Sequence, residues 1–412
     1  MDPLTQLIAL PEQMRRSMGL IHTPGEIHQQ PKTWRSTFER LQSRRSAIES
    51  ACGEFGLPPR PGRIAQVILT GAGSSDYIGR ALAGLLQQRW RCAVRSVPST
   101  ELLTSLDEYI LPGGLCLLLS FSRSGDSSEG VAVLQLAQQR YPERVRSIVI
   151  TCNAAGAMAT LPGVLSIVLD DAVNDRGLAM TSSFTNMLIA GQYLAYFDRT
   201  SDGKALVEEL VEDQASMAER LLPHAAGLAA QLAKKQCSRV CFLGSDALEA
   251  AAAESALKVL ELNAGNIATL AESFLGLRHG PMSFLNQQTL VCAFLSAEEP
   301  RLLYELDLLE EIRGKNLADG LLIVTPRSSA RVGKLTEHVI DLQAPPGFPD
   351  NMRPPVDVIL GQVLALFLSI ENGVRPDTPS TGAISRVVSH VTIYPPAASP
   401  RPTTAHDSNI SS

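Results

Sequence analysis

The stretch GSDALEAAAAESALKVLELNAGNIATLAESFLGLRHGP, residues 244–281, decides how the rest of the chain is arranged. The alanine and leucine residues of its first half predict a helix packed in a protein interior. Glu254, Lys258 and Glu261 follow one another at offsets of four and three, so this helix would carry all three charges on one face. Buried charges are costly without a partner or a task. The pattern therefore predicts either a salt-bridged helix face or a functional site, and the residues alone leave both open.

The residues that lead into this helix repeat an earlier part of the chain. Arg239–Ser245 corresponds to the strand and glycine turn of Gln66–Ser75, and later segments correspond in the same order. The repeated unit spans several strands and helices and is far longer than a solenoid unit of about 20 to 50 residues, so we expect a duplicated domain. In both copies buried strands alternate with helices, which predicts an α/β fold with helices on both faces of a parallel sheet. The expected strands are Ile64–Thr70, Leu115–Phe121, Val145–Thr151, Val164–Leu169, Thr289–Leu295 and Gly320–Thr325, and the expected helices are Tyr77–Leu86, Glu129–Arg140, Thr185–Phe197, Leu248–Leu262 and Val356–Ile370.

Breaks in these patterns divide the chain into five parts. Prolines and a glycine at Leu57–Gly62 end a helical leader, and a tail rich in proline, serine and threonine begins at Arg375. We expect this tail to fray after Tyr394. The expected parts are a leader and linker at 1–60, a first α/β domain at 61–200, an interdomain helix at 201–235, a second α/β domain at 236–374 and a tail at 375–412.

Composition excludes several classes of protein. With 412 residues, 45% of them apolar and 19% charged, the chain has the composition of a globular protein with full cores. A net charge of −6 offers no basic footprint for nucleic acid or for an anionic membrane surface. No window approaches the run of about eighteen apolar residues typical of a membrane span, and residues 1–20 lack the pattern of a signal peptide. We therefore expect a cytoplasmic protein.

The sequence predicts neither a metal site nor a cofactor. The seven cysteines are scattered without a Cys-x-x-Cys pair, which is typical of buried, reduced thiols. The histidines lack the helical spacing of a metal-binding pair. Gly71-Ala-Gly73 is followed by Asp76 where a dinucleotide fingerprint has its third glycine, so we discount nucleotide binding.

Two serine-rich loops follow strands of the first copy. Ser74-Ser75 and Ser122-Arg-Ser-Gly-Asp-Ser127 offer up to five hydroxyl groups, one guanidinium and the N–H groups of two helix starts, which suit a phosphate monoester. Such loops meet at the carboxyl edge of a parallel sheet, where ligands bind. Serine is also the ordinary N-cap residue, so capping is the alternative for either loop's serines taken singly. The second copy has SAEE at the equivalent residues 296–299, which would repel an anion, so only the first copy is expected to bind phosphate.

The imidazole of His279 lies in Leu277-Arg-His-Gly-Pro281, where glycine and proline constrain the backbone. A histidine in such a place is either an ordinary turn residue or an acid–base group presented by a loop. With Lys258 and Glu261 it completes a set of an amine, a carboxylate and an imidazole close together in the sequence. The residues leave both interpretations of His279 open.

Four motifs, taken together and in order, resemble the double sugar isomerase (SIS) domain family. They are SRSGDS at 122–127, MTSSFT at 180–185, ESALKVLE at 254–261 and RHGP at 278–281. The resemblance covers roughly residues 30–395. Within the family it points to the galactosamine-6-phosphate deaminase/isomerase branch, also called tagatose-6-phosphate ketose/aldose isomerase. It implies two tandem SIS domains, each a parallel-sheet three-layer α/β/α sandwich of flavodoxin-like type.

The resemblance extends to the isomerase half of glucosamine-6-phosphate synthase and implies roles for matching residues. Glu261 matches the base that transfers a proton between C1 and C2, Lys258 a sugar-contacting lysine, and His279 a ring-opening histidine that comes from the neighbouring subunit. A homodimer or homotetramer with shared active sites is thereby implied. Met282 stands where the branch usually has lysine, and the last lysine is Lys334, whereas the synthase uses a lysine in its C-terminal tail. The residues matching phosphate and sugar contacts are Ser74, Ser75, Ser122, Arg123 (in place of a glutamine), Ser124 and Ser127.

The activity implied by the resemblance is the deaminating isomerisation of an amino-sugar 6-phosphate, most directly D-galactosamine 6-phosphate to D-tagatose 6-phosphate and ammonia. A plain aldose/ketose isomerase of a hexose 6-phosphate would use the same base. A sensor that binds a sugar phosphate without catalysis is a further alternative, which Glu261 and His279 disfavour. The leader shows no basic helix-turn-helix, so a transcriptional regulator is disfavoured, and it is too short for the glutaminase domain of an amidotransferase.

Overall fold

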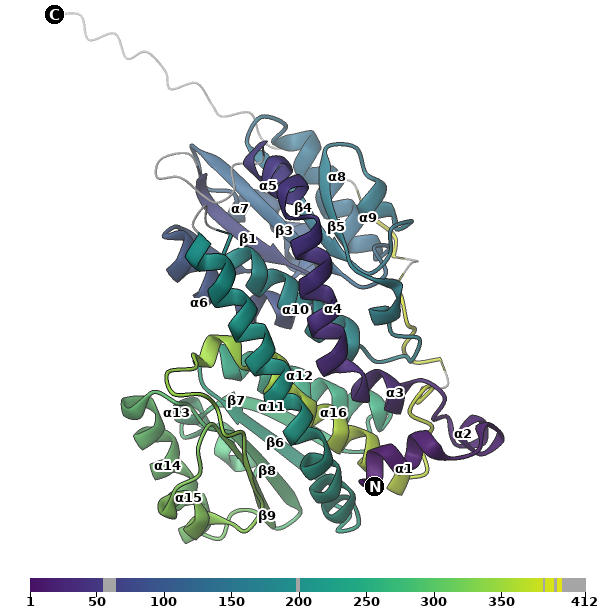
Figure 1. Cartoon of the computed structure of the whole chain (residues 1–412), viewed down its shortest axis with the longest axis vertical. Helices are drawn as coiled ribbons and strands as arrows, with labels where there is room; N and C mark the ends of the chain where they lie inside the picture. The colour runs from purple at the N-terminus through teal and green to yellow at the C-terminus, as the bar shows by residue number, and fades with distance from the viewer. Residues whose placement is uncertain (55–63, 198–200, 381, 389–390, 395–412) are drawn as a thin grey trace, which may run out of the picture.

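The computed structural model describes residues 1–54, 64–197, 201–380, 382–388 and 391–394. The linker expected at Leu57–Gly62 and the fraying expected after Tyr394 lie outside these residues. Figure 1 shows one sheet in each half of the molecule, with the long helices α4 (Gln30–Ser43) and α11 (Ser201–Ala233) running along one side. Each sheet contains the strands of one copy of the repeat. The limits 61–200 and 236–374 for the two domains stay predictions, and each range contains all the strands of one sheet.

The first sheet has five parallel strands in the order β2-β1-β3-β4-β5. The four strands expected here are confirmed, with ends that differ by at most one residue. Strand β2 and the helix α7 (Ser99–Tyr109) are not predicted from the sequence, because β2 has only four residues, AVRS, and shows no apolar run. The strands are β1 (Ile64–Thr70), β2 (Ala93–Ser96), β3 (Leu115–Ser122), β4 (Val145–Thr151) and β5 (Val164–Val168).

The second sheet repeats this arrangement in the order β10-β9-β8-β6-β7, again with all strands parallel. In both sheets the first strand lies between the second and the third, so the duplication predicted from the sequence is confirmed. Both sheets reverse their strand order beside the first strand, and such a switch point is where open α/β sheets bind ligands. The strands are β6 (Arg239–Gly244), β7 (Ala268–Ser273), β8 (Thr289–Phe294), β9 (Gly320–Thr325) and β10 (Val339–Asp341).

Helices cover both faces of each sheet, as predicted. In the first sheet, Leu69 packs in the same core as helices α6 (Ser74–Trp90) and α10 (Ser182–Ala195), whereas Ile68 packs with α7 and α8 (Ser128–Arg140) on the other face. The second sheet is covered by α12 (Ala247–Leu262) and α16 (Pro354–Glu371) on one face and by α14 (Glu299–Gly314) and α15 (Ala330–Leu335) on the other. The remaining helices are α1 (Pro3–Ala9), α2 (Glu12–Met18), α3 (Thr23–His28), α5 (Arg45–Glu54), α9 (Ala157–Thr160) and α13 (Phe274–Leu277), and the 3-10 turns are η1 (Asp171–Val173), η2 (Pro281–Phe284) and η3 (Asp350–Met352).

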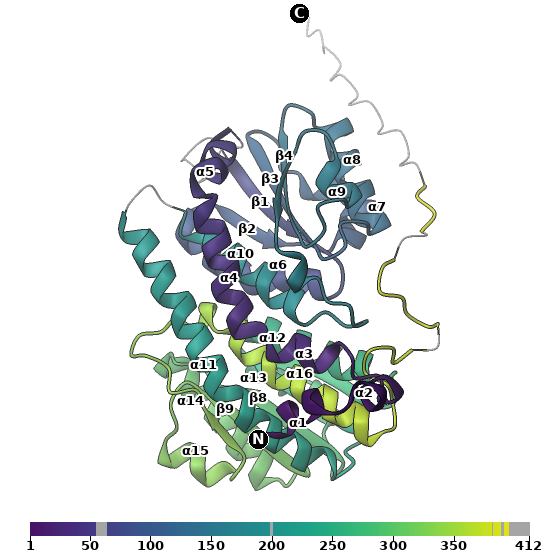
Figure 2. The same cartoon turned by 45° about the vertical axis from the view of Figure 1, so that its right-hand side comes forward.

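One apolar core runs through both halves and includes residues of α6, α10, α11, α12 and α16. Helix α12 packs against α16 at very short range, because a Cβ added at Gly361 would lie 2.7 Å from the Cα of Ser255. Helix α12 also packs against α6 of the other half. The helix that carries the charged cluster therefore lies at the contact between the two halves, beside α6 of the first copy (Figure 2).

Helix α16 is long and apolar enough to cross a membrane by length and composition, but 89% of its 18-residue window is buried inside the protein. It packs against α11 and α12 and supplies core residues along its whole length, from Val356 to Leu368. Its apolar composition is thus accounted for by packing between the two halves.

Candidate active site

The three charges of α12 form a buried cluster. Lys258 and Glu254 are fully buried, and the Glu261 side chain is 23% exposed. The Lys258 Nζ lies 2.5 Å from Glu261 Oε2 and 3.2 Å from Glu254 Oε1. The salt-bridged helix face expected as one interpretation is therefore present. It is not an exposed surface pair, however, since it lies at the contact between α12 and α6.

The cluster reaches across to the first copy. The Lys258 ammonium donates a hydrogen bond of 2.9 Å to Ser74 Oγ, at the first residue of α6. The turn before this helix is made by Gly73, whose φ of 57° and ψ of −127° glycine adopts without the strain that a side chain would bring. This turn places Ser74 and Ser75 beyond the carboxyl end of β1, both buried. Residues far apart in the sequence thus meet at the switch point of the first sheet.

Burial sets the charge of this cluster. Desolvation raises the pKa of Glu254 to about 7, although the ammonium of Lys258 opposes the rise. Desolvation also acts to lower the pKa of Lys258, but the carboxylates of Glu254 and Glu261 outweigh it, so that this pKa is raised. The ammonium is therefore charged at neutral pH, while Glu254 exchanges its proton in the same pH range.

The serine loops of the first copy line a cavity of about 140 Å³. Its wall includes five of the predicted phosphate residues, which are Ser75, Ser122, Arg123, Ser124 and Ser127. Met180 of the MTSSFT motif also lines it. The sixth predicted residue, Ser74, adjoins Ser75 and bonds to Lys258 instead. The structure thus brings the two predicted groups of residues, the serine loops and the α12 charges, to one edge of the first sheet.

The hydroxyls in these loops do not act as ordinary helix caps. Ser127 occupies the N-cap position of α8, but its side chain makes no capping hydrogen bond, and the N-cap position of α6 belongs to Gly73 instead of Ser74. The Ser122 and Ser124 hydroxyls accept hydrogen bonds from the amides of Gly125 and Asp126, at 3.0 and 3.2 Å. These bonds hold the loop in shape and leave the hydroxyl protons available as donors.

The guanidinium of Arg123 is buried beside the cavity without a carboxylate partner. It donates a hydrogen bond of 3.2 Å to the Leu178 carbonyl and another to the Arg386 carbonyl. No ion pair to Arg123 occurs within the part of the chain that the structure describes. Desolvation and the nearby Arg386 lower its pKa, whereas Asp175 and Glu261 act in the opposite direction. Because these hydrogen bonds go to neutral carbonyls, the positive charge of Arg123 is not neutralised and can pair with a bound anion.

The loop of His279 belongs to the second copy. His279 is exposed on the turn between α13 and η2, and its backbone amide donates a hydrogen bond of 2.9 Å to the Gly276 carbonyl. Neither His279 nor Met282 is among the described residues that line the 140 Å³ cavity. The structure therefore does not place this imidazole in the wall of the cavity.

Two parts of the site are not predicted from the sequence. Four residues of the tail, Ser385–Val388, form a wall of the cavity, although their composition reads only as a linker. Asp175 also has no signal in the sequence, yet its carboxylate accepts hydrogen bonds from the amides of Thr181 and Ser183 at 2.8 Å each. It thereby holds the start of α10, and with it the MTSSFT motif, against the cavity.

The corresponding loops of the second copy carry carboxylates. Asp246 occupies the turn position that Gly73 has in the first copy. In the next loop, the amide of Ser296 donates a hydrogen bond of 2.7 Å to the Glu305 carboxylate. Desolvation raises the pKa of Glu305 to about 7. Carboxylates therefore lie beside these loops of the second copy, and the expectation that only the first copy accepts phosphate stays a prediction.

Comparison with known proteins supports this arrangement. The SIS domain family matches residues 63–196. The D-galactosamine-6-phosphate deaminase AgaS of Escherichia coli is 35% identical over 380 residues, which cover 90% of this chain and 95% of that protein. The chain belongs to the double SIS family, in its galactosamine-6-phosphate deaminase/isomerase branch.

Further members of this SIS branch show the same relationship. The D-galactosamine-6-phosphate deaminase AgaS of a Shewanella species is 33% identical over 385 residues, which cover 92% of each chain. The crystal structure of tagatose-6-phosphate ketose/aldose isomerase from Escherichia coli superposes with a TM-score of 0.81 at 32% identity, over 91% of this chain and 97% of that one. The two tandem SIS domains expected from the sequence are therefore confirmed.

Proposed function

We propose that this SIS protein is an enzyme that converts D-galactosamine 6-phosphate to D-tagatose 6-phosphate and ammonia. The observation that carries the proposal is the contact between Lys258 and Ser74, which joins a buried acid–base cluster to a serine-lined cavity. The names of the AgaS deaminases and of the tagatose-6-phosphate isomerase that it resembles support the same reaction. A sensor without catalysis is disfavoured, since two charges buried in α12 would have no task in it.

In this proposal the phosphate lies among Ser75, Ser122, Ser124 and Ser127, with Arg123 pairing its charge. The open-chain amino sugar then extends toward α12. Glu261 takes the proton from C2 to give an enolamine and returns a proton to C1, which yields an imine at C2. Water adds to this imine, ammonia leaves, and the C2 ketone of tagatose 6-phosphate remains. The net reaction consumes one water and is therefore a hydrolytic deamination as well as an isomerisation.

Lys258 and Glu254 support this proton transfer by position and charge. The ammonium lies between Glu261 and Ser74, where it can stabilise negative charge that develops on the sugar oxygen at C1. Glu254, whose desolvation raises its pKa to about 7, balances the ammonium from the buried side. Holding these groups on one rigid helix is the kind of positioning that accelerates a proton transfer.

The proposal is tested by incubating the purified protein with galactosamine 6-phosphate and measuring ammonia and ketose phosphate. Wild-type protein is expected to form both in equal amounts. E261Q should lower kcat about 10²- to 10⁴-fold, the usual contribution of a general base. E249Q, which changes another carboxylate of α12, is the matched control and should retain activity. If wild-type protein forms neither product, the proposal is wrong.

A plain aldose/ketose isomerase is the second candidate, because the structure from Escherichia coli carries that description in its name. The same base would move the same proton, and only the substituent at C2 would differ. Ketose phosphate formed from an aldose 6-phosphate without any ammonia from the amino sugar would favour this alternative.

Further parts of the proposal are a homodimer or homotetramer in the cytoplasm, without nucleic acid or membrane as a partner. The exposed position of His279 supports a shared site, in which His279 of the partner subunit opens the sugar ring above Glu261. Co-expression of E261Q and H279A chains tests this. Each variant alone should be inactive, while the mixed oligomer combines an intact Glu261 with an intact His279 and should regain activity. Failure of the mixed oligomer to regain activity would place both residues in one chain.

A further inference from the structure

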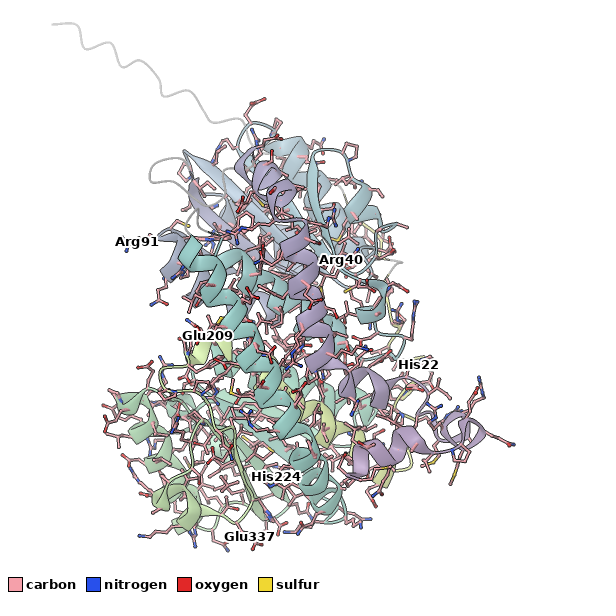
Figure 3. All side chains as sticks on the ribbon, in the orientation of Figure 1. His22, Arg40, Arg91, Glu209, His224 and Glu337 are labelled. Carbon is pink, nitrogen blue, oxygen red and sulfur yellow. The ribbon has the colours of Figure 1, made fainter. Side chains whose placement is uncertain are left out.

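The tail crosses from the second half of the molecule to the first. After α16 ends at Glu371, it runs up one side of the molecule to the first sheet, as the yellow segment of Figures 1 and 2 shows. Asp377 fixes the start of this path, because its carboxylate accepts hydrogen bonds of 2.8 Å from the amide of Thr23 and 2.7 Å from that of Ile21. This junction lies next to His22, which Figure 3 labels at the start of α3. The tail then reaches the cavity with four residues, Ser385–Val388, which we call the strap.

The strap occupies donors of the cavity with its backbone oxygens. The Val388 carbonyl accepts a hydrogen bond of 3.1 Å from the amide of Ser128, the first residue of α8. The Arg386 carbonyl accepts one from the Arg123 guanidinium. A helix-start amide and a guanidinium are donors that a phosphate group also requires. The two carbonyls therefore stand where phosphate oxygens would bind.

One side chain holds the strap in place. The Arg386 Nε donates a hydrogen bond of 2.9 Å to the backbone carbonyl of Asp175, and its Nη2 donates one of 2.8 Å to Asn174 Oδ1. Neither partner is a carboxylate, so the charge of Arg386 is not neutralised by these bonds. Arg386 and Arg123 thus both line the cavity with positive charge. Burial lowers the pKa of Arg123, and the nearby charge of Arg386 lowers it further.

Little apolar surface holds the strap in this position. Val388 is 49% exposed as a whole residue, and Ile384, which precedes the strap, is 42% exposed. Segments that bury few apolar contacts open locally at low free-energy cost. Exchange of two neutral carbonyl acceptors for a phosphate dianion would in turn strengthen the hydrogen bonds, since charge-assisted bonds are about twice as strong as neutral ones.

We propose that the strap Ser385–Val388 is a displaceable cover of the phosphate cavity, whose carbonyl oxygens compete with the substrate phosphate for Arg123 and the start of α8. The inference rests on the proposed function in one respect, that phosphate binds in this cavity. Binding then exchanges the Arg386 and Val388 carbonyls for phosphate oxygens and releases the strap from α8. Release of product phosphate allows the strap to return.

Limited digestion of the full chain by trypsin tests the displacement, because trypsin cuts after Arg386 only when the strap leaves the surface. Inorganic phosphate serves as the probe, its binding is measured separately by calorimetry, and chloride at equal ionic strength is the blank. Cleavage after Arg91, which lies on the surface at the end of α6 (Figure 3), is the internal reference. Saturating phosphate should speed cleavage after Arg386 about tenfold relative to Arg91, because cleavage follows the open population.

Each outcome bears on a different claim. If phosphate binds while cleavage after Arg386 stays constant or slows, the strap does not move aside, and this inference fails while the proposed phosphate site stands. If phosphate does not bind at all, both the strap inference and the proposed phosphate site fail.

A variant outside the cavity tests the competition itself. N174A removes one acceptor of Arg386 but no residue that lines the cavity, so the strap should open more often and phosphate should bind more tightly. Loss of one hydrogen bond predicts a decrease of the phosphate Kd by about two- to tenfold. Q138A, which removes a side-chain hydrogen bond to the Pro162 carbonyl away from the cavity and from Asn174, is the matched control and should bind like wild type. An unchanged Kd in a folded N174A protein would overturn the competition.

Discussion

The Lys258 ammonium donates a hydrogen bond of 2.9 Å to the Ser74 hydroxyl, and this bond joins the two copies of the duplicated fold. Lys258 belongs to α12 of the second copy, whereas Ser74 begins α6 of the first. The same nitrogen lies 2.5 Å from Glu261 and 3.2 Å from Glu254. The cluster thus depends on the packing of one copy against the other, and a change in that packing would alter both charge and position at the site.

Replacement of Lys258 by methionine should destabilise the protein in a way that depends on pH. Removal of one partner of a buried ion pair costs about 3 to 5 kcal/mol, because the other charge stays buried without compensation. At acidic pH the loss should be smaller, since Glu254, whose pKa desolvation already raises to about 7, is then protonated. Chemical denaturation of K258M at pH 6 and at pH 8 measures the difference. K315M, which removes an exposed pair with Glu311, should cost less than about 1 kcal/mol.

Removal of the Ser122 and Ser124 hydroxyls should act on substrate binding. Phosphate contacts persist from the ground state to the transition state, so S122A/S124A is expected to raise KM about tenfold and to leave kcat within about twofold. Steady-state kinetics with galactosamine 6-phosphate measures both constants. The exposed S17A variant should leave both unchanged. A fall in kcat at constant KM would argue against phosphate binding at this loop.

Glu26 should make the protein less stable as the pH rises. Desolvation, together with the charge of Asp175, raises its pKa from 4.5 to about 8. Between these values the unfolded chain has released the proton that the folded protein retains, so the free energy of unfolding falls by up to about 1.4 kcal/mol per pH unit. Above the folded pKa of about 8 the loss levels off. Denaturation of E26Q at pH 5, 6.5 and 8 should show a weaker decline than wild type, and an equally steep decline would assign it to other groups.

Replacement of Asp246 by glycine should stabilise the protein. Asp246 adopts φ of 56° and ψ of −122°, nearly the values of Gly73 in the first copy. A residue with a side chain is strained there by about 1 to 3 kcal/mol, and D246G is expected to recover about 1 kcal/mol after the entropy of glycine is counted. Its contact with Arg301, at 3.7 Å and largely exposed, contributes little. A thermal midpoint of D246G at or below that of wild type would contradict the expectation, and N316G serves as a control because asparagine tolerates its φ of 51°.

Local patterns in the sequence were sufficient for most of the fold. Alternating apolar strands and helices predict both sheets, and the correspondence of Arg239–Ser245 with Gln66–Ser75 predicts their duplication. Short elements with few apolar residues, such as β2 and β10, leave no such pattern and are missed. The Glu254, Lys258 and Glu261 cluster was also predictable, because offsets of three and four fix one helix face.

The sequence by itself determined which residues share a strand, a turn or a helix face, since these relations depend on the local geometry of the backbone. Only the tertiary structure decided that Lys258 bonds to Ser74, 184 residues away, and that carbonyls of Arg386 and Val388 close the cavity of the first copy. Contacts of this kind depend on how whole helices pack and on backbone atoms that every residue possesses. They therefore leave no periodic or compositional mark in the sequence, and the tail that reads as a linker proves to cover the site.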